Sequence, residues 1–177
     1  MSDIRKITRD WSEILISSLV IVFIVKTFFF TTYLVPTSSM YPIVCPGEKI
    51  IVNKMKKDVK RGDVVAFYNP LQKKQRLLKR LIGLPGDRLE IKDHSLYVNG
   101  KLQKGYEKLE FLKIDPDDLS YKYCLSIPDN NYYFIGDNVQ NSRDSRYWGF
   151  VNKNDIIGKA VLIYWPIIKM RKINGWK

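Results

Sequence analysis

The stretch Pro36-Thr37-Ser38-Ser39-Met40-Tyr41-Pro42 directly follows the one long apolar run of this 177-residue chain. It places three adjacent hydroxyl side chains between two prolines, which fix the backbone dihedral φ at both ends. A hydroxyl cluster held at the edge of a membrane segment fits a nucleophile fixed near the bilayer surface. Taken alone, the stretch is more typical of a polar turn between an anchor and a domain, so the decision depends on the rest of the chain.

The apolar run before this stretch predicts a membrane anchor. Residues 14–25 are apolar apart from two serines, and Lys26 ends the run. Twelve helical residues cover only about 18 Å, whereas the hydrocarbon core of a bilayer is about 30 Å thick. Either Lys26 extends its amine to the interface and the helix continues toward Val35, or the helix ends near Thr27. Strand-forming aromatic and β-branched residues crowd positions 28–35, which favours the second solution.

No small-x-small cleavage site follows the apolar run, so an uncleaved anchor is expected rather than a removable signal peptide. We therefore predict a short cytoplasmic tail at 1–10, a transmembrane anchor at 11–27 and a β-rich domain at 28–177. Basic residues flank the run on both sides, so charge does not decide the orientation.

The chain after residue 42 has the alternating apolar pattern and the turn signals of a mainly β fold. Turns such as Pro85-Gly86 and Asn99-Gly100 separate the short apolar segments. Residues 101–128 are mixed and polar, and we expect an excursion from the core there. The predicted strands are Lys49–Asn53, Val64–Tyr68, Leu77–Ile82, Arg88–Lys92, Leu96–Val98, Tyr132–Ile135 and Ile157–Trp165.

Composition leaves two kinds of partner open. The net charge is +12, and residues 1–35 hold four basic and three acidic side chains, so +11 remains on the rest. Such a basic domain fits nucleic acid, an anionic membrane surface or a solvated basic face. Cys45 and Cys124 fit either one disulfide or two thiols. Without a Cys/His cluster we expect no metal site.

The position of the single histidine indicates that a serine nucleophile in this chain would use a different general base. The one histidine, His94, lies in a predicted hairpin turn far in sequence from the hydroxyl cluster. Lys79, by contrast, lies in the apolar strand Leu77–Ile82 beside Arg80. Because side chains alternate across a strand, at least one of these two cations is set against apolar surface. A buried lysine loses solvation, its pKa falls, and its neutral amine can act as a general base.

A dense polar loop follows the last predicted short strand. It contains Gly136-Asp137-Asn138, Ser142, Asp144 and Arg146. Asp144 and Arg146 can form an ion pair, and Ser142 can hydrogen-bond a neighbouring amine. A hydrogen-bonded, Asx-rich turn is the simpler interpretation of the same residues.

Together these segments resemble the type I signal peptidases, the membrane-bound Ser-Lys endopeptidases that remove signal peptides from exported proteins. Residues 36–42 look like the family's Pro-Ser-Gly-Ser-Met-x-Pro box, with Thr37 in place of Ser and Ser38 in place of Gly. Gly62-Asp63-Val64-Val65 and Lys79–Asp87 match two further boxes, and residues 136–149 match the fourth except at 139–140. The resemblance extends from the anchor to about residue 166.

The resemblance implies a β-rich catalytic domain behind a single membrane segment, on the outer side of the cell membrane. Its implied substrates are preproteins bound as extended strands, with small residues at −1 and −3. No cofactor, metal or nucleic acid is implied. A dedicated pilin or conjugation peptidase of the same chemistry, and a tethered basic module that binds nucleic acid or anionic lipid, remain alternatives. The resemblance implies that Ser39 is the nucleophile and Lys79 the base. It implies that Thr37 contacts the oxyanion, that Ser142 orients the lysine, and that Asp144 and Arg146 form a supporting ion pair. The implied substrate-binding residues are Val35, Met40, Leu77 and Leu78.

Overall fold

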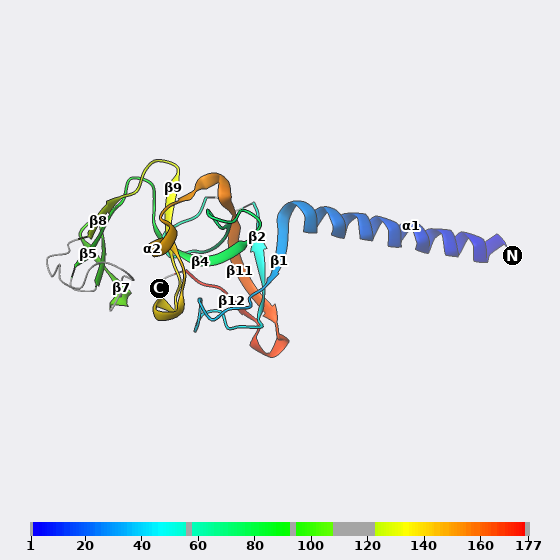
Figure 1. Cartoon of the computed structure of the whole chain (residues 1–177). Coiled ribbons are helices and arrows are strands. Elements are labelled where there is room, and N and C mark those ends of the chain that lie inside the picture. Colours follow the sequence, from blue (N-terminus) through cyan, green and yellow to red (C-terminus); the bar gives the residue numbers. More distant parts are fainter. Residues whose placement is uncertain (1, 56–57, 93–94, 108–122, 176–177) are drawn as a thin grey trace.

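A long N-terminal helix leads into the β-rich part of the molecule. The structure, a computed structural model, describes residues 2–55, 58–92, 95–107 and 123–175. Helix α1 (Ser2–Ile24) projects away from the sheets and continues as a π-helical segment, η1 (Val25–Phe29) (Figure 1). Strand β1 (Phe30–Leu34) begins directly afterwards. The change from helix to strand that was predicted near Thr27 therefore occurs within three residues of that position.

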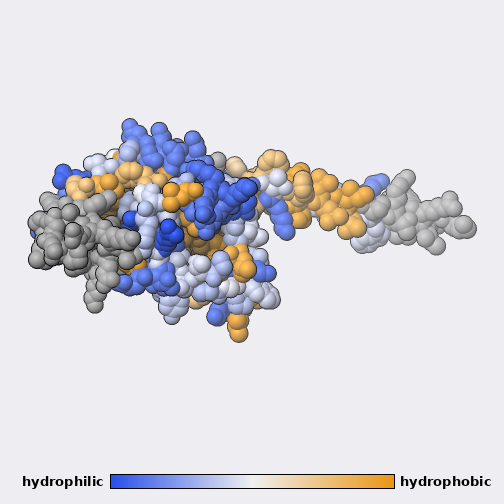
Figure 2. All heavy atoms as spheres, in the orientation of Figure 1, coloured by the Kyte–Doolittle hydropathy of each residue, from blue (hydrophilic) through white to orange (hydrophobic). Residues whose placement is uncertain are grey.

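The predicted tail at 1–10 and the predicted anchor at 11–27 do not form separate elements, because α1 already begins at Ser2. The side chains from Ile14 to Ile24 on this helix are exposed, and Figure 2 shows them as an apolar surface on the projecting helix. Among the described residues, no helix has both the length and the apolar character that a membrane crossing requires.

The larger sheet has eight strands and holds most of the molecule together. Its order is β1-β2-β11-β3-β4-β9-β10, with β12 paired to β11. The described strands in it pair antiparallel, as expected for short strands joined by turns. The bounds are β2 (Lys49–Asn53), β3 (Val64–Tyr68), β4 (Arg76–Gly83), β9 (Asn131–Ile135), β10 (Val151–Asn152), β11 (Ile156–Trp165) and β12 (Arg171–Lys172).

A smaller, four-stranded sheet lies at the end of the molecule away from α1 (Figure 1). It is ordered β7-β6-β5-β8, with β5 (Arg88–Lys92), β6 (Ser95–Val98), β7 (Lys101–Glu107) and β8 (Tyr123–Ser126). Strands β7 and β8 were not predicted, because their polar composition hides the one face that packs inward. The segment 101–128 is thus partly a second sheet. Residues 108–122 lie outside the described part of the chain, as does the turn predicted at His94.

All seven predicted strands are present. Three have the predicted bounds, and the other four are one or two residues longer. Their burial follows the pattern that predicted them. In β2, for example, Ile50 and Val52 are buried while the alternate residues are more exposed. Strand β3 is buried on both faces from Val64 to Phe67, because it lies in the middle of the larger sheet.

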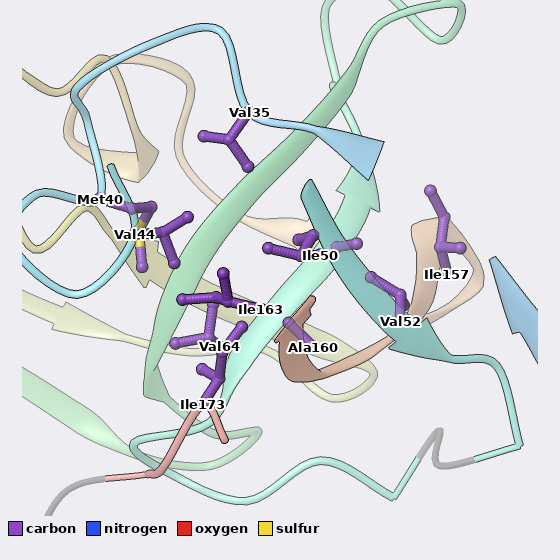
Figure 3. Packing of buried hydrophobic residues seen from close by; sticks show 11 residues of the cluster. Val35, Met40, Val44, Ile50, Val52, Val64, Ile157, Ala160, Ile163 and Ile173 are labelled. Carbon is purple, nitrogen blue, oxygen red and sulfur yellow. The ribbon is translucent and has the colours of Figure 1, made fainter. Parts of the chain in front are cut away.

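One core cluster lies directly below the hydroxyl stretch. Met40 and Val44, from the loop after β1, are fully buried and pack with residues of β2, β3 and β11. Figure 3 shows Met40 and Val44 side by side, close to Ile163 and Val64. Truncating a buried side chain of this size costs about 2–5 kcal/mol. The loop that carries Ser39 is therefore fixed to the core by the residue that follows it.

Four short helical segments complete the described chain. They are α2 (Ser145–Trp148), η2 (Val139–Asn141), η3 (Lys153–Asp155) and η4 (Ile167–Lys169).

Candidate active site

The hydroxyl of Ser39 and the amine of Lys79 meet at the base of the loop after β1. The Nζ atom of Lys79 lies 2.5 Å from the Oγ atom of Ser39, across 40 positions of sequence. Both residues are buried, with 8% and 3% of their surface exposed, respectively. A nucleophile and a base within hydrogen-bond distance are the first geometric requirement of an activated serine.

The environment of Lys79 favours its neutral form. Burial lowers the pKa of the Lys79 amine from 10.5 to about 8. The charge of Asp144 raises this pKa and the charge of Arg146 lowers it, so the nearby ion pair partly cancels itself. No carboxylate among the described residues forms an ion pair with Lys79. The sequence prediction of a lysine with a lowered pKa agrees with this environment.

Arg80, the neighbour of Lys79, is equally buried but has a different partner. Its guanidinium donates two hydrogen bonds, of 2.6 and 2.7 Å, to the carboxylate of Asp137. A third bond goes to the carbonyl of Gly62. Sequence reasoning did not identify the Arg80–Asp137 pair, because alternation along the strand predicted only that at least one of the two cations is set against apolar surface. This pair joins the start of the polar loop to β4.

Asp144 organises the polar loop. Its carboxylate accepts bonds from the Nε and Nη2 atoms of Arg146 at 2.8 and 2.9 Å, which is the predicted ion pair. It also accepts a bond from the hydroxyl of Ser142 at 2.7 Å and one from the Gly136 backbone N–H at 3.0 Å. With no exposed surface, this carboxylate needs all these donors. The hydroxyl hydrogen of Ser142 is thus directed to Asp144.

Gly136 allows the polar loop to approach Ser39 closely. A Cβ atom at this position would overlap the side chain of Ser142 and the carbonyl oxygen of Ser39. Asn138 adds two bonds to the same loop, from its N–H to the Ser39 carbonyl at 3.1 Å and from its amide to the Ser38 carbonyl at 3.1 Å. These contacts place Ser142 and Ser39 on either side of a residue that has no side chain.

Thr37 and the backbone of Ser39 supply two donors beside the Ser39 hydroxyl. The Thr37 hydroxyl lies 3.3 Å from the Oγ atom of Ser39. Among the described residues, none accepts a hydrogen bond from the Ser39 backbone N–H. An unused N–H and a hydroxyl at this place have the donor types of an oxyanion hole.

A half-buried ion pair fixes the far end of the loop that carries Ser39. The Glu48 carboxylate, 2% exposed, accepts two bonds from Arg171 at 2.9 and 3.0 Å and one from the Cys45 N–H at 2.9 Å. Arg171 also donates to the Ile43 carbonyl. No local sequence pattern indicates this contact, because 123 positions separate the two charges. Cys45 and Cys124 are both free thiols, which settles the question left open by their spacing.

A cavity of about 130 Å³ opens beside Ser39 and Lys79. The four residues that the resemblance assigned to substrate binding all line it, namely Val35, Met40, Leu77 and Leu78. Two strand edges border it. Among the described strands, β1 pairs only with β2, so its second edge is open. Strand β4 pairs with β9 only from Arg80 onward, so the residues of β4 before Arg80 have no described partner strand on that edge. Unpaired edges of this kind can accept an extended peptide by strand addition.

Comparisons with known proteins identify the family of the chain. The family described as signal peptidase, peptidase S26, matches residues 8–165. Signal peptidase I P from Bacillus subtilis subsp. natto is 40% identical over 171 residues, covering 92% of this chain and 91% of the relative. Signal peptidase I S from Bacillus subtilis strain 168 is 32% identical over 179 residues, covering 96% of each chain. A solved signal peptidase I from Enterococcus faecalis V583 is 32% identical, covers 57% of this chain and 95% of its own, and superposes with a TM-score of 0.45. The chain therefore belongs to the signal peptidase family, peptidase S26, and is a serine peptidase.

Proposed function

We propose that this protein cleaves N-terminal signal peptides from exported preproteins, with Ser39 as the nucleophile and Lys79 as the general base. The 2.5 Å approach of the Lys79 amine to the Ser39 hydroxyl supports this assignment most directly. A lysine whose pKa is lowered to about 8 is neutral in about a tenth of the molecules at pH 7, and this neutral form can accept the proton of the hydroxyl.

Acylation follows from this pair. The neutral amine of Lys79 accepts the hydroxyl proton as the Oγ atom of Ser39 attacks the carbonyl carbon of the scissile bond. The backbone N–H of Ser39 and the hydroxyl of Thr37 donate to the oxyanion that forms. The protonated Lys79 then gives its proton to the leaving amine, and the peptide bond breaks.

Deacylation uses the same base a second time. The Lys79 amine takes a proton from water, the resulting hydroxide attacks the ester of Ser39, and the proton returns to the Oγ atom when the ester breaks. Ser142 suits the orienting role, because its hydroxyl hydrogen is donated to Asp144 and its oxygen lone pairs are left to accept from the protonated amine.

The cavity suits small residues before the cleaved bond. The cavity has a volume of about 130 Å³, which is enough for the side chains of small residues. Its walls are largely apolar, including Leu77 and Leu78 from β4 and Val35 after β1. We therefore propose that the residues at −1 and −3 enter this cavity while the peptide backbone lies along the open strand edges.

Attachment to a membrane is a further part of the proposal. The exposed apolar side chains of α1 continue into Phe28, Phe29 and Phe30, which are 62, 41 and 37% exposed. This continuous surface would hold the catalytic domain close to substrates that are still in the bilayer, on the outer side of the cell membrane. The single-pass topology predicted for residues 11–27 stays a prediction, which membrane fractionation combined with protease protection tests.

The test of the reaction is cleavage of a preprotein with a small-x-small site by the full chain purified in detergent. Ser39→Ala and Lys79→Ala should abolish cleavage. Ser126→Ala and Lys74→Ala, which remove the same groups from exposed positions outside the site, should retain it. Cleavage by all five proteins would identify a contaminant or another nucleophile, and the proposed pair would be wrong.

A further inference from the structure

Arg76, the first residue of β4, lies at the border of the substrate cavity. It lines the cavity together with Tyr33 of β1 and Leu78 of β4. Its guanidinium lies 5.4 Å from the ring centroid of Tyr33 and 6.0 Å from that of Tyr68. Two ring faces within about 6 Å are the geometry of cation–π contacts. The two rings therefore orient an exposed arginine at the mouth of the cavity, instead of leaving it free to turn into solvent.

The charge of Arg76 is not neutralised by the protein. Its interactions with the described residues are the two ring contacts, and no described carboxylate forms an ion pair with it. The preceding loop adds Lys73 and Lys74, and of these Lys73 is paired with Asp155 at 2.6 Å. The mouth of the cavity is consequently positive.

Strand geometry fixes which part of a substrate would meet Arg76. Arg76 lies three residues before Lys79 on β4, or about 10 Å along the strand. The residue at −1 must lie at Ser39, since the nucleophile attacks its carbonyl. The apolar cavity takes the residues that precede the cleaved bond, so the chain runs from Ser39 toward Arg76 with decreasing number. About three further residues cover that distance, which brings the side chains at −4 and −5 within reach of the long arginine side chain.

We propose that Arg76 is a specificity-determining residue that favours preproteins with a carboxylate side chain at −4 or −5 and disfavours those with a basic side chain there. This inference rests on the proposed function, because it assumes that signal peptides occupy the cavity. The guanidinium supplies several N–H donors in a plane, which suits a carboxylate. The tyrosine rings limit its movement and so reduce the entropy lost on binding.

The test uses preproteins that are identical except for Glu, Gln or Lys at −4 or at −5. For the wild type we expect kcat/KM to be about threefold higher with Glu than with Gln and about threefold lower with Lys, as for exposed ion pairs. Arg76→Gln should bring the ratio of Glu to Lys substrates from about tenfold to about one, and Arg76→Glu should reverse it. Raising the salt concentration should reduce the wild-type ratio.

Lys74→Gln is the matched control, since it removes one positive charge from the same loop outside the cavity lining. It should keep the tenfold ratio. Equal cleavage of the Glu and Lys substrates by the wild type, or an equal loss of the ratio in Lys74→Gln, would overturn the inference while leaving the proposed function intact. A uniform loss on all substrates by Arg76→Gln would instead indicate a structural role and would also overturn it.

Repeating these cleavage assays in vesicles of anionic phospholipid separates substrate binding from lipid binding. If Arg76→Gln lowered activity only in vesicles of anionic phospholipid, and equally for all substrates, the arginine would bind lipid headgroups and the inference would be wrong. Failure of the wild type on every substrate would reject the proposed function and this inference with it.

Discussion

Lys79→Met should inactivate the enzyme and make its fold more stable. The substitution keeps the length and apolar stem of the side chain but removes an amine that is 3% exposed. The folded protein lowers the pKa of this amine from 10.5 to about 8, which corresponds to about 3 kcal/mol of cost for the protonated form. Methionine avoids that cost and loses one hydrogen bond to Ser39, worth about 1 kcal/mol. The expected net gain in unfolding free energy at pH 6.5 is about 2 kcal/mol.

The gain should depend on pH in a defined direction. Because the pKa is lower in the folded state, the unfolded chain binds more protons between about pH 8 and pH 10.5, and wild-type stability rises with pH across that window. Below pH 8 the full cost is present. At pH 9.5 it has fallen to about 1 kcal/mol, which the lost hydrogen bond roughly cancels. For a chain of 177 residues, 2 kcal/mol corresponds to a rise in Tm of about 4–8 °C.

Urea unfolding followed by circular dichroism in detergent, at pH 6.5 and pH 9.5, measures this effect. Lys74→Met is the control, because its side chain is exposed and the change should stay within about 0.5 kcal/mol at both pH values. The same pKa governs activity, so wild-type kcat/KM should rise with pH with a midpoint of about 8. A Lys79→Met protein that is less stable than the wild type at pH 6.5, or whose gain does not shrink at pH 9.5, would refute the buried neutral base.

Three further substitutions test the surroundings of the pair. Gly136→Ala places a methyl group against the Ser142 side chain, so kcat should fall at least about 100-fold through misplacement of the loop; activity close to wild type would show that the loop can shift freely. Arg171→Gln leaves the buried Glu48 carboxylate without its main partner and should lower unfolding free energy by about 2–3 kcal/mol, with partial recovery in Arg171→Lys. Thr37→Val should lower kcat about 100-fold with little change in KM, and a change in KM alone would exclude the oxyanion role.

The strands were predictable from sequence because each buries residues on one face, and these residues appear in the sequence as alternating apolar positions. Lys49–Asn53 and Arg88–Lys92 show it clearly and have the predicted bounds. Strands β7 and β8 were missed because edge positions of the small sheet tolerate polar residues, and their pairing with β6 and β5 is what defines them. Local pattern cannot show a partner that is distant in the chain.

The same limit applies to the site. The sequence pointed to Ser39 and Lys79 separately, one from hydroxyls between prolines and one from a cation in an apolar strand. Alternation along β4 placed Lys79 and Arg80 on opposite faces, but it could not show that only Arg80 would meet a carboxylate. Asp137, its partner, is 57 positions away. Which cation is paired, and which is free to act as a base, is decided by tertiary structure.

The arrangement of charges explains why Lys79 can serve as the base although two carboxylates lie close enough to affect it. Asp144 and Asp137 both raise the pKa of its amine, and an unpaired carboxylate about 5 Å away would stabilise the ammonium by about 3 kcal/mol at an effective dielectric constant of 20. That equals the effect of burial and would return the pKa of the Lys79 amine to the range of an ordinary lysine. Each carboxylate instead has its own arginine, Arg146 for Asp144 and Arg80 for Asp137, both with short two-point contacts. The two pairs hold the polar loop against the segment that carries Ser39, and the charge of Arg146 opposes that of Asp144 at the amine, so burial remains the dominant influence on Lys79.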